Sequence, residues 1–465
     1  MTAPVLLKGR RAAPPDHSQL GLLLRNLAAR HHVPGAQLAV LHGADGLTEF
    51  AVETGEERFG GGSPVTPGSR FPVGSLTKAF TALLLMTLAD DGEVDLDTPV
   101  GAQFPELSTL PGGYGSRLLP RHLLSHTSGL PAGHPADSPP GDRGQYLREA
   151  CAARPVCAPG AAFSYSNVGI VAAGHLAELA LGMSWEEALR SVVLGPLGIE
   201  AAWVTPGAGL PGPAHVPGHT ARPELGKAVP VGQLLAAVEA PAGGLALSAR
   251  DLLSFGRLFT DHPLRRRGGL LPGPRVTEAM RRSQPHTDAF GLADTWGLGL
   301  AGYQAPNGQL WFGHDGTGDG TSCHLRVDPQ EGTVVALTTN AGTGLALWED
   351  LVAGLHELGI PVASHPFAEP RGSAPPAPPS LVARCAGTYV NGAVTYDFVQ
   401  DADGLRLDQS GGPYARIALR TDLAFSVVEL TTEKTAYAGR FIQDPGTGRI
   451  DGMQISGRLA ARDHA

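Results

Sequence analysis

Apolar residues in the first quarter of the chain form two kinds of pattern, one with helical spacing and one continuous. Residues 20–29 have helical spacing, and the continuous apolar run over residues 34–41 predicts a buried strand. A long helix is predicted between Phe71 and Asp91, because Pro72 stands at its start and Gly92 follows its end. The pattern therefore begins with a helix, a strand and a second helix.

The pattern changes twice more before residue 365. Residues from about 93 to 240 predict helices broken by Pro- and Gly-rich loops, among them a helix over residues 185–193. β-like patterns follow at residues 297–303, 310–314, 322–327 and 334–339, and one more helix is predicted over residues 345–358. The predicted order is a helix and a strand at each end of the segment, most strands late in it, and a run of helices between them. This order indicates an α/β domain with an α subdomain.

The last hundred residues have a different pattern again. Six prolines indicate a stiff linker over residues 366–380. Seven short alternating segments follow, the last of them over residues 449–458, and predict a meander of strands. The chain is therefore predicted to hold a domain over residues 1–365, the linker, and a small β barrel or sandwich over residues 381–465 that docks on the first domain.

Composition narrows the functional classes. The 465 residues include 35 basic and 44 acidic side chains, a formal charge of −9. An acidic chain without basic runs argues against nucleic acid and anionic membrane surfaces as partners. The longest helix-like apolar run, residues 79–89, is too short to span a bilayer. The first 17 residues hold an Arg pair and a Pro pair where a signal peptide needs an unbroken apolar stretch, which predicts a cytoplasmic protein.

The cysteines point to no metal or disulfide chemistry. They are too few and too irregular for a disulfide framework, and none has zinc-site spacing with His: Cys151, Cys157, Cys323 and Cys385. We therefore expect neither a metal site nor a cofactor. Lysine is rare compared with arginine: the chain has four lysines and 31 arginines. Each of the four lysines is therefore of interest.

Ser75-Leu76-Thr77-Lys78 is the first candidate for chemistry. Residues three apart share a face of a helix, so the amine of Lys78 can reach the hydroxyl of Ser75. Ser75 falls at the start of the predicted helix, where free backbone N–H groups favour developing negative charge. A serine hydroxyl needs a neighbouring base, and a desolvated lysine can lose its proton near neutral pH. A surface Ser/Lys pair is the alternative explanation.

Two further segments hold candidate groups. Tyr165-Ser166-Asn167 could aim a phenol and an amide into one cleft, the first to relay a proton and the second to bind a substrate carbonyl. His314-Asp315-Gly316 ends an apolar strand, where His314 could hydrogen-bond the tyrosine. The N–H of Thr317 could then complete an oxyanion hole with that of Ser75. Each segment also has a purely structural explanation when it is considered alone. The tyrosine could belong to the core and the asparagine to a turn, and the histidine could lie in a hairpin.

The three motifs S-x-x-K, Y-x-N and H-x-G, in this order, resemble the serine β-lactamase and penicillin-binding-protein superfamily, in particular its class C and esterase-like branch. The resemblance covers roughly residues 20–360 and includes the segments RHLLSHTSGLP, PGAAFSYSNVGIVAAGHLAEL and PAGGLALSARDLLSF. It implies a β-lactamase/DD-peptidase-like antiparallel sheet flanked by helices, with an α subdomain.

The resemblance also implies roles for individual residues. Ser75 corresponds to the acylated nucleophile, and Lys78 and Tyr165 to the pair that transfers protons. Which of these two is the base stays open. Asn167 corresponds to the residue that binds the substrate amide, and His314 to the partner from the third motif. Gly244, inside the PAGGLALSARDLLSF segment, is assigned to substrate binding.

Two departures narrow the resemblance. β-Lactamases and carboxypeptidases carry K-T/S-G at the third motif, where a cation and a hydroxyl bind a substrate carboxylate, whereas this chain has His314-Asp315-Gly316. The predicted absence of an export signal and the C-terminal β unit make the chain most similar to the penicillin-binding-protein-type thioesterases of nonribosomal peptide assembly. Those enzymes act in the cytoplasm and carry a lipocalin-like C-terminal domain.

This finer resemblance implies a reaction and a partner. Ser75 would take a peptide from the thioester of a peptidyl carrier protein, and the amine of the peptide would release it as a macrolactam. A D-residue is favoured at the acylated end, and Arg458 could reach over the cleft to bind the peptide. The alternatives are a cytoplasmic esterase, D-peptidase or β-lactamase-type hydrolase, and a non-catalytic binding protein on the same scaffold.

Overall fold

The computed structural model describes residues 16–464 except for 44–47, 111, 137–140, 206–211, 262–271, 366–369, 371, 410–411 and 431–432. The first 15 residues, on which the expectation about a signal peptide largely rests, lie outside the described residues. So do five residues of the predicted linker.

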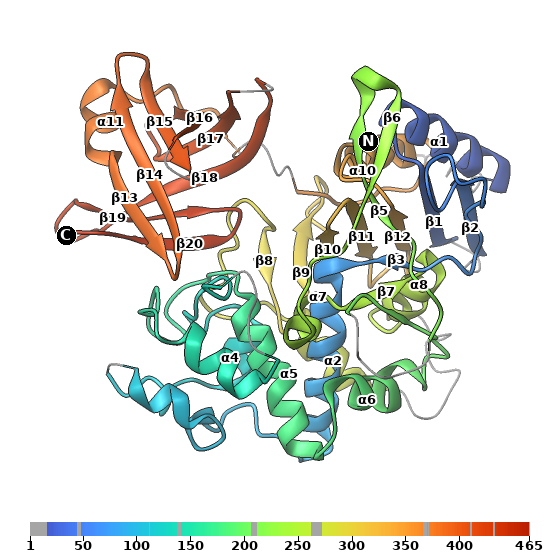
Figure 1. Cartoon of the computed structure of the whole chain (residues 1–465), viewed down its shortest axis with the longest axis horizontal. Helices are drawn as coiled ribbons and strands as arrows, with labels where there is room; N and C mark the ends of the chain where they lie inside the picture. Colours follow the sequence, from blue (N-terminus) through green and yellow to red (C-terminus); the bar gives the residue numbers. More distant parts are fainter. Residues whose placement is uncertain are drawn as a thin grey trace, which may run out of the picture.

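A seven-stranded antiparallel sheet forms the centre of the first 365 residues (Figure 1). In the order β2-β1-β12-β11-β10-β9-β8 its strands are β2 (Thr48–Gly55), β1 (Gly35–His42), β12 (Val334–Thr339), β11 (Thr321–Val327), β10 (Leu310–Gly318), β9 (Ala301–Gln304) and β8 (Thr295–Trp296). β1 comes first along the chain and β12 comes last among the strands of this sheet, and the two pair with each other. This pairing brings the two ends of the domain together.

Alternating side chains bury both faces of the sheet. Leu38 and Val40 of β1 pack with α1 (His17–Arg30) and α10 (Gly344–Glu357), whereas the odd-numbered Ala39 belongs to the core on the side of α8 (Ala249–Arg257). Period-two alternation with apolar residues on both faces explains the continuous apolar run in the sequence. The predicted α/β architecture is confirmed.

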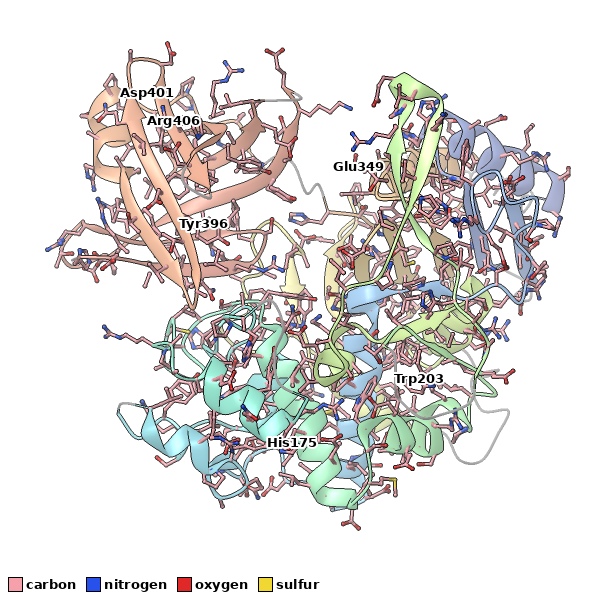
Figure 2. All side chains as sticks on the ribbon, viewed as in Figure 1. His175, Trp203, Glu349, Tyr396, Asp401 and Arg406 are labelled. Atoms are coloured by element: carbon pink, nitrogen blue, oxygen red, sulfur yellow. The ribbon has the colours of Figure 1, made fainter. Side chains whose placement is uncertain are left out.

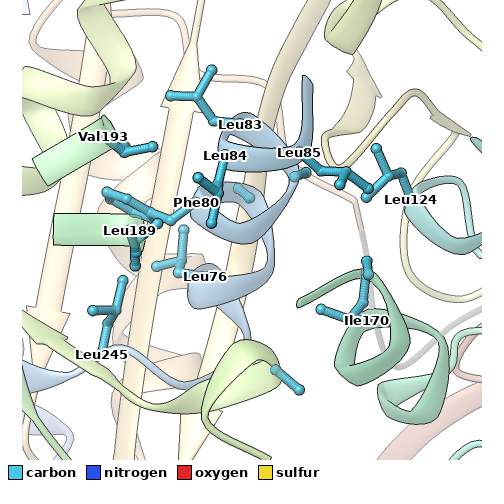
Figure 3. Close-up of a cluster of buried hydrophobic side chains, with 14 of the residues drawn as sticks. Leu76, Phe80, Leu83, Leu84, Leu85, Leu124, Ile170, Leu189, Val193 and Leu245 are labelled. Atoms are coloured by element: carbon cyan, nitrogen blue, oxygen red, sulfur yellow. The ribbon is translucent and has the colours of Figure 1, made fainter. Parts of the chain in front are cut away.

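A helical subdomain packs around α2, which is buried along most of its length. Figure 3 shows leucines of α2 in one buried cluster with Leu124, Ile170 and Leu189 from the surrounding segments. The α helices of this subdomain are α2 (Thr77–Asp90), α3 (Pro120–Leu124), α4 (Arg143–Ala150), α5 (Asn167–Leu181), α6 (Trp185–Leu189) and α9 (Pro274–Arg281). A helix that is apolar on all sides belongs inside a core, so α2 is fixed in place by its neighbours.

Short elements complete the domain. A small sheet joins β3 (Phe71–Pro72), β7 (Leu245–Leu247) and β4 (Ala202–Trp203), and β5 (Gly218–Arg222) pairs with β6 (Lys227–Val231) in a hairpin. The helix predicted between Phe71 and Asp91 therefore begins only at Thr77, because its first two residues pair with β7 instead.

The C-terminal unit is a closed eight-stranded antiparallel barrel, at the upper left of Figure 1. It follows helix α11 (Pro379–Cys385) and consists of β13 (Gly387–Asn391), β14 (Val394–Asp401), β15 (Gly404–Gln409), β16 (Gly412–Leu419), β17 (Ala424–Glu429), β18 (Thr435–Gln443), β19 (Ile450–Ile455) and β20 (Arg458–Arg462). Phe398, Phe425 and Phe441 meet in its interior with ring centroids 4.9–5.8 Å apart. The predicted small all-β domain is confirmed.

Two details of this unit differ from the expectation. The single strand predicted over residues 449–458 is wrong, because Ser456 and Gly457 both have positive φ and form the tight turn between β19 and β20. The described part of the Pro-rich segment is also not free of contacts, since the N–H of Ala377 bonds to the carbonyl of Leu419 on β16. The boundaries of the linker stay a prediction.

The barrel docks on the first domain through buried polar contacts. The Asn391 side chain accepts a hydrogen bond from the N–H of Ala132 at 2.8 Å and donates to the carbonyl of Leu459 at 2.6 Å. Gln454 donates to the carbonyl of Asp288 at 3.0 Å. Asn391 and Gln454 are 1% and 2% exposed, so these bonds are shielded from water and orient the barrel on the domain.

Within the described residues, no single helix has the length and hydropathy needed to cross a membrane. The α5 helix and the segment Trp185–Leu194 pass that test only together, as a pair bent by 81°.

We expect Asn391→Ala to lower the free energy of unfolding by about 1–3 kcal/mol, because the buried N–H of Ala132 and the carbonyl of Leu459 lose their partner. Urea unfolding measures the change. Thr395→Ala, an exposed position in the same barrel, is the control and should stay within about 0.5 kcal/mol of wild type. Equal stability of the two variants would contradict the docking role of Asn391.

Candidate active site

Ser75 stands in a single 3₁₀ turn, η1 (Gly74–Leu76), directly before α2. This turn packs on strand β10 with no room for a side chain between them: a Cβ on Gly316 would collide with the carbonyl of Val73, and one on Gly74 with the backbone of Thr317. Glycine at these two positions lets the two backbones touch. The backbones around Ser75 and Thr317 are therefore neighbours, as an oxyanion hole requires.

Lys78 lies on the first turn of α2 and points back at Ser75. Its Nζ is 2.9 Å from Ser75 Oγ and donates to the carbonyl of Ala242 at 2.7 Å. Lys78 is 1% exposed, and burial lowers the pKa of its amine to about 7. The charge of Arg458 contributes to this lowering, and Glu239 acts in the opposite direction. The amine is therefore close to half neutral at neutral pH.

Two basic side chains lie close to the ring of Tyr165. Lys78 Nζ and the guanidinium carbon of Arg458 are each 5.2 Å from the centre of its ring. Burial raises the pKa of the Tyr165 phenol to about 12, while a side-chain hydrogen bond with Ser75 and the charge of Arg458 pull it down. The phenol therefore keeps its proton at neutral pH and can donate it.

The sequence departs from the K-T/S-G motif at His314, and the structure shows the effect of that change. His314 Nδ1 is 2.6 Å from the carbonyl oxygen of Asp315, which can only accept, so Nδ1 carries the proton. Burial, together with the charge of Lys78, lowers the pKa of the ring to about 4. His314 is therefore neutral and presents the lone pair of Nε2, which has no partner among the described residues.

A buried polar network anchors the strand behind His314. The carboxylate of Asp315 receives two bonds from Arg326, at 2.8 and 2.9 Å, one from His324 at 2.6 Å and one from Tyr303 at 3.0 Å. Burial by itself would raise the pKa of Asp315, but the charge of Arg326 and the bonds from His324 and Arg326 hold it below its usual range. The carboxylate is fully used inside the protein, so it orients β10 and leaves no capacity for substrate.

Two cavities meet at Ser75. The first, of about 490 Å³, lies between the first domain and the barrel and is lined by Ser75, Tyr165, Trp296, His314 and Thr317 together with Tyr396, Leu407, Val427, Ile455 and Arg458 of the barrel. Figure 2 labels Tyr396 on the barrel. The second, of about 400 Å³, is lined by Ser75, Lys78, Asn167, Gln233, Glu239 and Thr317.

The structure thus gathers all but one of the predicted residues at one place. Asn167 begins α5 and faces the second cavity, and Arg458 reaches the first cavity from the barrel. Gly244 is the exception: it lines neither cavity, its N–H bonds to Ala240 and its carbonyl to the N–H of Val204. Its neighbour Gly243 forms the wall, so the assignment of Gly244 to substrate binding is not supported.

Sequence reasoning missed several residues of the site. His126 is buried against the Tyr165 ring with centroids 4.3 Å apart, and its Nδ1 accepts the N–H of Ser166. It belongs to the RHLLSHTSGLP segment, which therefore did contain a signal. Trp296 and Glu239 lie in the walls of the two cavities without any local motif that could have indicated them.

Among the described residues, no group of three or more His, Cys, Asp or Glu side chains is arranged to hold a metal ion. The four cysteines are free.

Comparison with known proteins identifies the family. The model described as Beta-lactamase matches residues 22–353, well over half of the chain. Penicillin-binding protein 4 of Amycolatopsis lactamdurans is 32% identical over 397 residues, which cover 81% of this chain and 98% of that protein. The chain therefore belongs to the beta-lactamase family of serine β-lactamases and penicillin-binding proteins, and the prediction from its three motifs is confirmed.

Solved structures extend the likeness to the barrel. Two crystal structures of SurE, one of them with D-Leu, are 35% and 34% identical, cover 96% of this chain and 99% of theirs, and have TM-scores of 0.82 and 0.80. A D-stereospecific amidohydrolase from Streptomyces sp. is 26% identical, covers 72% of this chain and 98% of its own, and has a TM-score of 0.55. The finer resemblance, to the penicillin-binding-protein-type thioesterases, is confirmed by the likeness to SurE.

The pKa of Lys78 predicts how the reactivity of Ser75 depends on pH. The rate of fluorophosphonate labelling should be low where Lys78 is protonated, rise through a midpoint near 7 and level off above it. Arg458→Gln removes a charge that lowers this pKa, so the midpoint should move to higher pH. Arg416→Gln, an exposed arginine on the same barrel, should leave it in place. A midpoint that does not move in Arg458→Gln would contradict this coupling.

Proposed function

We propose that the protein is a serine acyl-enzyme peptide cyclase, which accepts a nonribosomal peptide from the thioester of a peptidyl carrier protein and releases it by head-to-tail macrolactamization. The observation that carries the proposal is the contact of the barrel with the reacting residues: the carbonyl of Gly457 accepts the N–H of Tyr165 at 2.9 Å, and Arg458 covers its ring. The likeness to SurE over both parts of the chain supports it.

In the first step neutral Lys78 removes the proton of Ser75 Oγ, which attacks the thioester carbonyl. Lys78 fits the role of base better than Tyr165, because its pKa of about 7 leaves it substantially neutral while the phenol, at about 12, stays protonated. The N–H groups of Ser75 and Thr317 stabilise the oxyanion. The thiol leaves with a proton relayed through Tyr165, and the peptide is left as an ester on Ser75.

The first cavity suits the peptide of this acyl-enzyme. Its walls combine apolar and aromatic side chains from both the first domain and the barrel with the guanidinium of Arg458, which can bind peptide carbonyl or carboxylate oxygens. His314, being neutral, offers no cation for a free carboxylate of the kind that β-lactams present. Asn167, from the facing cavity, is placed to bind a substrate amide.

Release as a ring requires that an amine reach the ester before water does. The barrel roofs the first cavity and thereby limits water around Tyr165 and Ser75. The same acyl-enzyme resolved by water would make the protein a D-peptide hydrolase, a second candidate that the likeness to a D-stereospecific amidohydrolase favours. A cytoplasmic location, where carrier proteins hold their peptides, is part of the proposal.

A synthetic peptidyl thioester with a free N-terminal amine tests the proposal. With a D-residue at the acylated end we expect the macrolactam as the main product, and with the L-epimer at least about tenfold less of it, measured by liquid chromatography and mass spectrometry. Ser75→Ala should form no adduct and no product. Linear acid as the sole product from the D-substrate would overturn the cyclase and leave the hydrolase.

The barrel turn should control the competition between amine and water. Gly457 has φ of 70°, and a Cβ there would collide with Leu292, so Gly457→Ala should displace the turn from Tyr165 and raise the fraction of linear acid. The product ratio is the measurement. Gly412→Ala, a barrel glycine with open space around it, is the matched control. An unchanged ratio in Gly457→Ala would argue against the roof.

A further inference from the structure

The two cavities at Ser75 differ in charge. The first contains the guanidinium of Arg458, and its carboxylates are already paired: Asp315 by Arg326, and Asp408 by Arg406 at 2.6 Å. A cationic group approaching Ser75 from this side would meet Arg458. The second cavity contains no arginine in its described lining and two carboxylates, those of Glu239 and Asp319.

Each of these two carboxylates has one oxygen that accepts a hydrogen bond from the protein, and Glu239 is the one whose charge acts on Lys78. Asp319 accepts the N–H of Leu234 at 2.8 Å and holds the loop in place. Glu239 ends the 3₁₀ turn η6 (Ala237–Glu239), and its Oε1 accepts the hydroxyl of Tyr146 at 3.0 Å. Within the described residues nothing donates to its Oε2. One oxygen is thus oriented by the protein and the other is available in the cavity.

Glu239 also lies close to the reacting groups. Its charge acts on Lys78, whose amine touches Ser75 Oγ, and all three side chains line the same cavity. A carboxylate near a buried lysine base is not needed for that base, since it favours the protonated form that cannot accept a proton. Its presence in the wall is explained if it serves a cationic ligand instead.

We propose that Glu239 binds the α-ammonium group of the peptide that resolves the acyl-enzyme, so that the second cavity is the amine subsite of the cyclase. This rests on the proposed function. The ammonium donates to Oε2 of Glu239 and gives one proton to neutral Lys78. The resulting amine attacks the ester carbonyl; the C–N bond forms, the C–Oγ bond to Ser75 breaks, and Oγ takes back a proton from the amide nitrogen through Lys78 or Tyr165.

An intermolecular ligation separates amine binding from acylation. The donor is an N-acetylated peptidyl N-acetylcysteamine thioester with a D-residue at its acylated end, and thiol release reports acylation. L-Leucine amide at increasing concentration is the nucleophile, and the ratio of amide to linear acid gives its half-saturating concentration. We expect Glu239→Gln to raise this concentration at least about tenfold, the loss of a hydrogen bond between charged groups.

A second nucleophile shows whether the effect depends on charge. Hydroxylamine is uncharged at pH 8, so its half-saturating concentration should change less than about twofold in Glu239→Gln. Glu93→Gln, beyond the far end of α2, removes the same charge elsewhere and should change neither value. Glu239→Asp keeps the charge and should restore part of the affinity for L-leucine amide.

The outcomes distinguish this inference from the function on which it rests. If wild type releases no thiol from the donor, the proposed function fails and the inference fails with it. If thiol is released but Glu239→Gln leaves the value for L-leucine amide unchanged, or raises both nucleophiles equally, the inference alone is wrong. A rise confined to the charged amine supports it.

Discussion

The burial of one amine shapes this active site. Lys78 is almost completely withdrawn from water, and the two atoms that accept its hydrogen bonds, Ser75 Oγ and the carbonyl of Ala242, carry no formal charge. A buried ammonium without a partner in an ion pair is costly, so the neutral form becomes accessible near pH 7. The apolar surroundings of α2 serve this purpose as well as stability, since any opening to water would return the amine to its ordinary protonation.

The C-terminal barrel takes part in the same electrostatic arrangement. Its Arg458 lies beside Tyr165, and the charge of Arg458 both favours neutral Lys78 and eases deprotonation of the phenol. The turn that carries Arg458 is held by the hydrogen bond that the N–H of Tyr165 donates to the carbonyl of Gly457, and by the docking of Asn391. Docking of the barrel and tuning of the catalytic groups are therefore one structural property, which explains why a domain distant in sequence belongs to the site.

The sequence predicted what depends on local pattern. The helix around Lys78, the strands β1, β10, β11 and β12 and the three motifs are encoded by spacing within a few residues, and the structure brings Ser75, Lys78, Tyr165 and His314 together. The sequence pattern could not predict contacts between segments that are distant along the chain. Glu239 reaches the second cavity because η6 packs beside α5. The β19–β20 turn was missed because it depends on a positive φ at Ser456, a conformation that residues other than glycine seldom adopt.

The ionisation of Lys78 can be observed directly, since the chain contains only four lysines. Protein labelled with ¹³C and ¹⁵N in lysine gives four side-chain signals, and Lys78→Met assigns the one of interest. Titration by heteronuclear NMR should show the Lys78 signal changing protonation with a pKa of about 7. A Lys78 signal that titrates at the ordinary lysine value of about 10.4 would contradict the account.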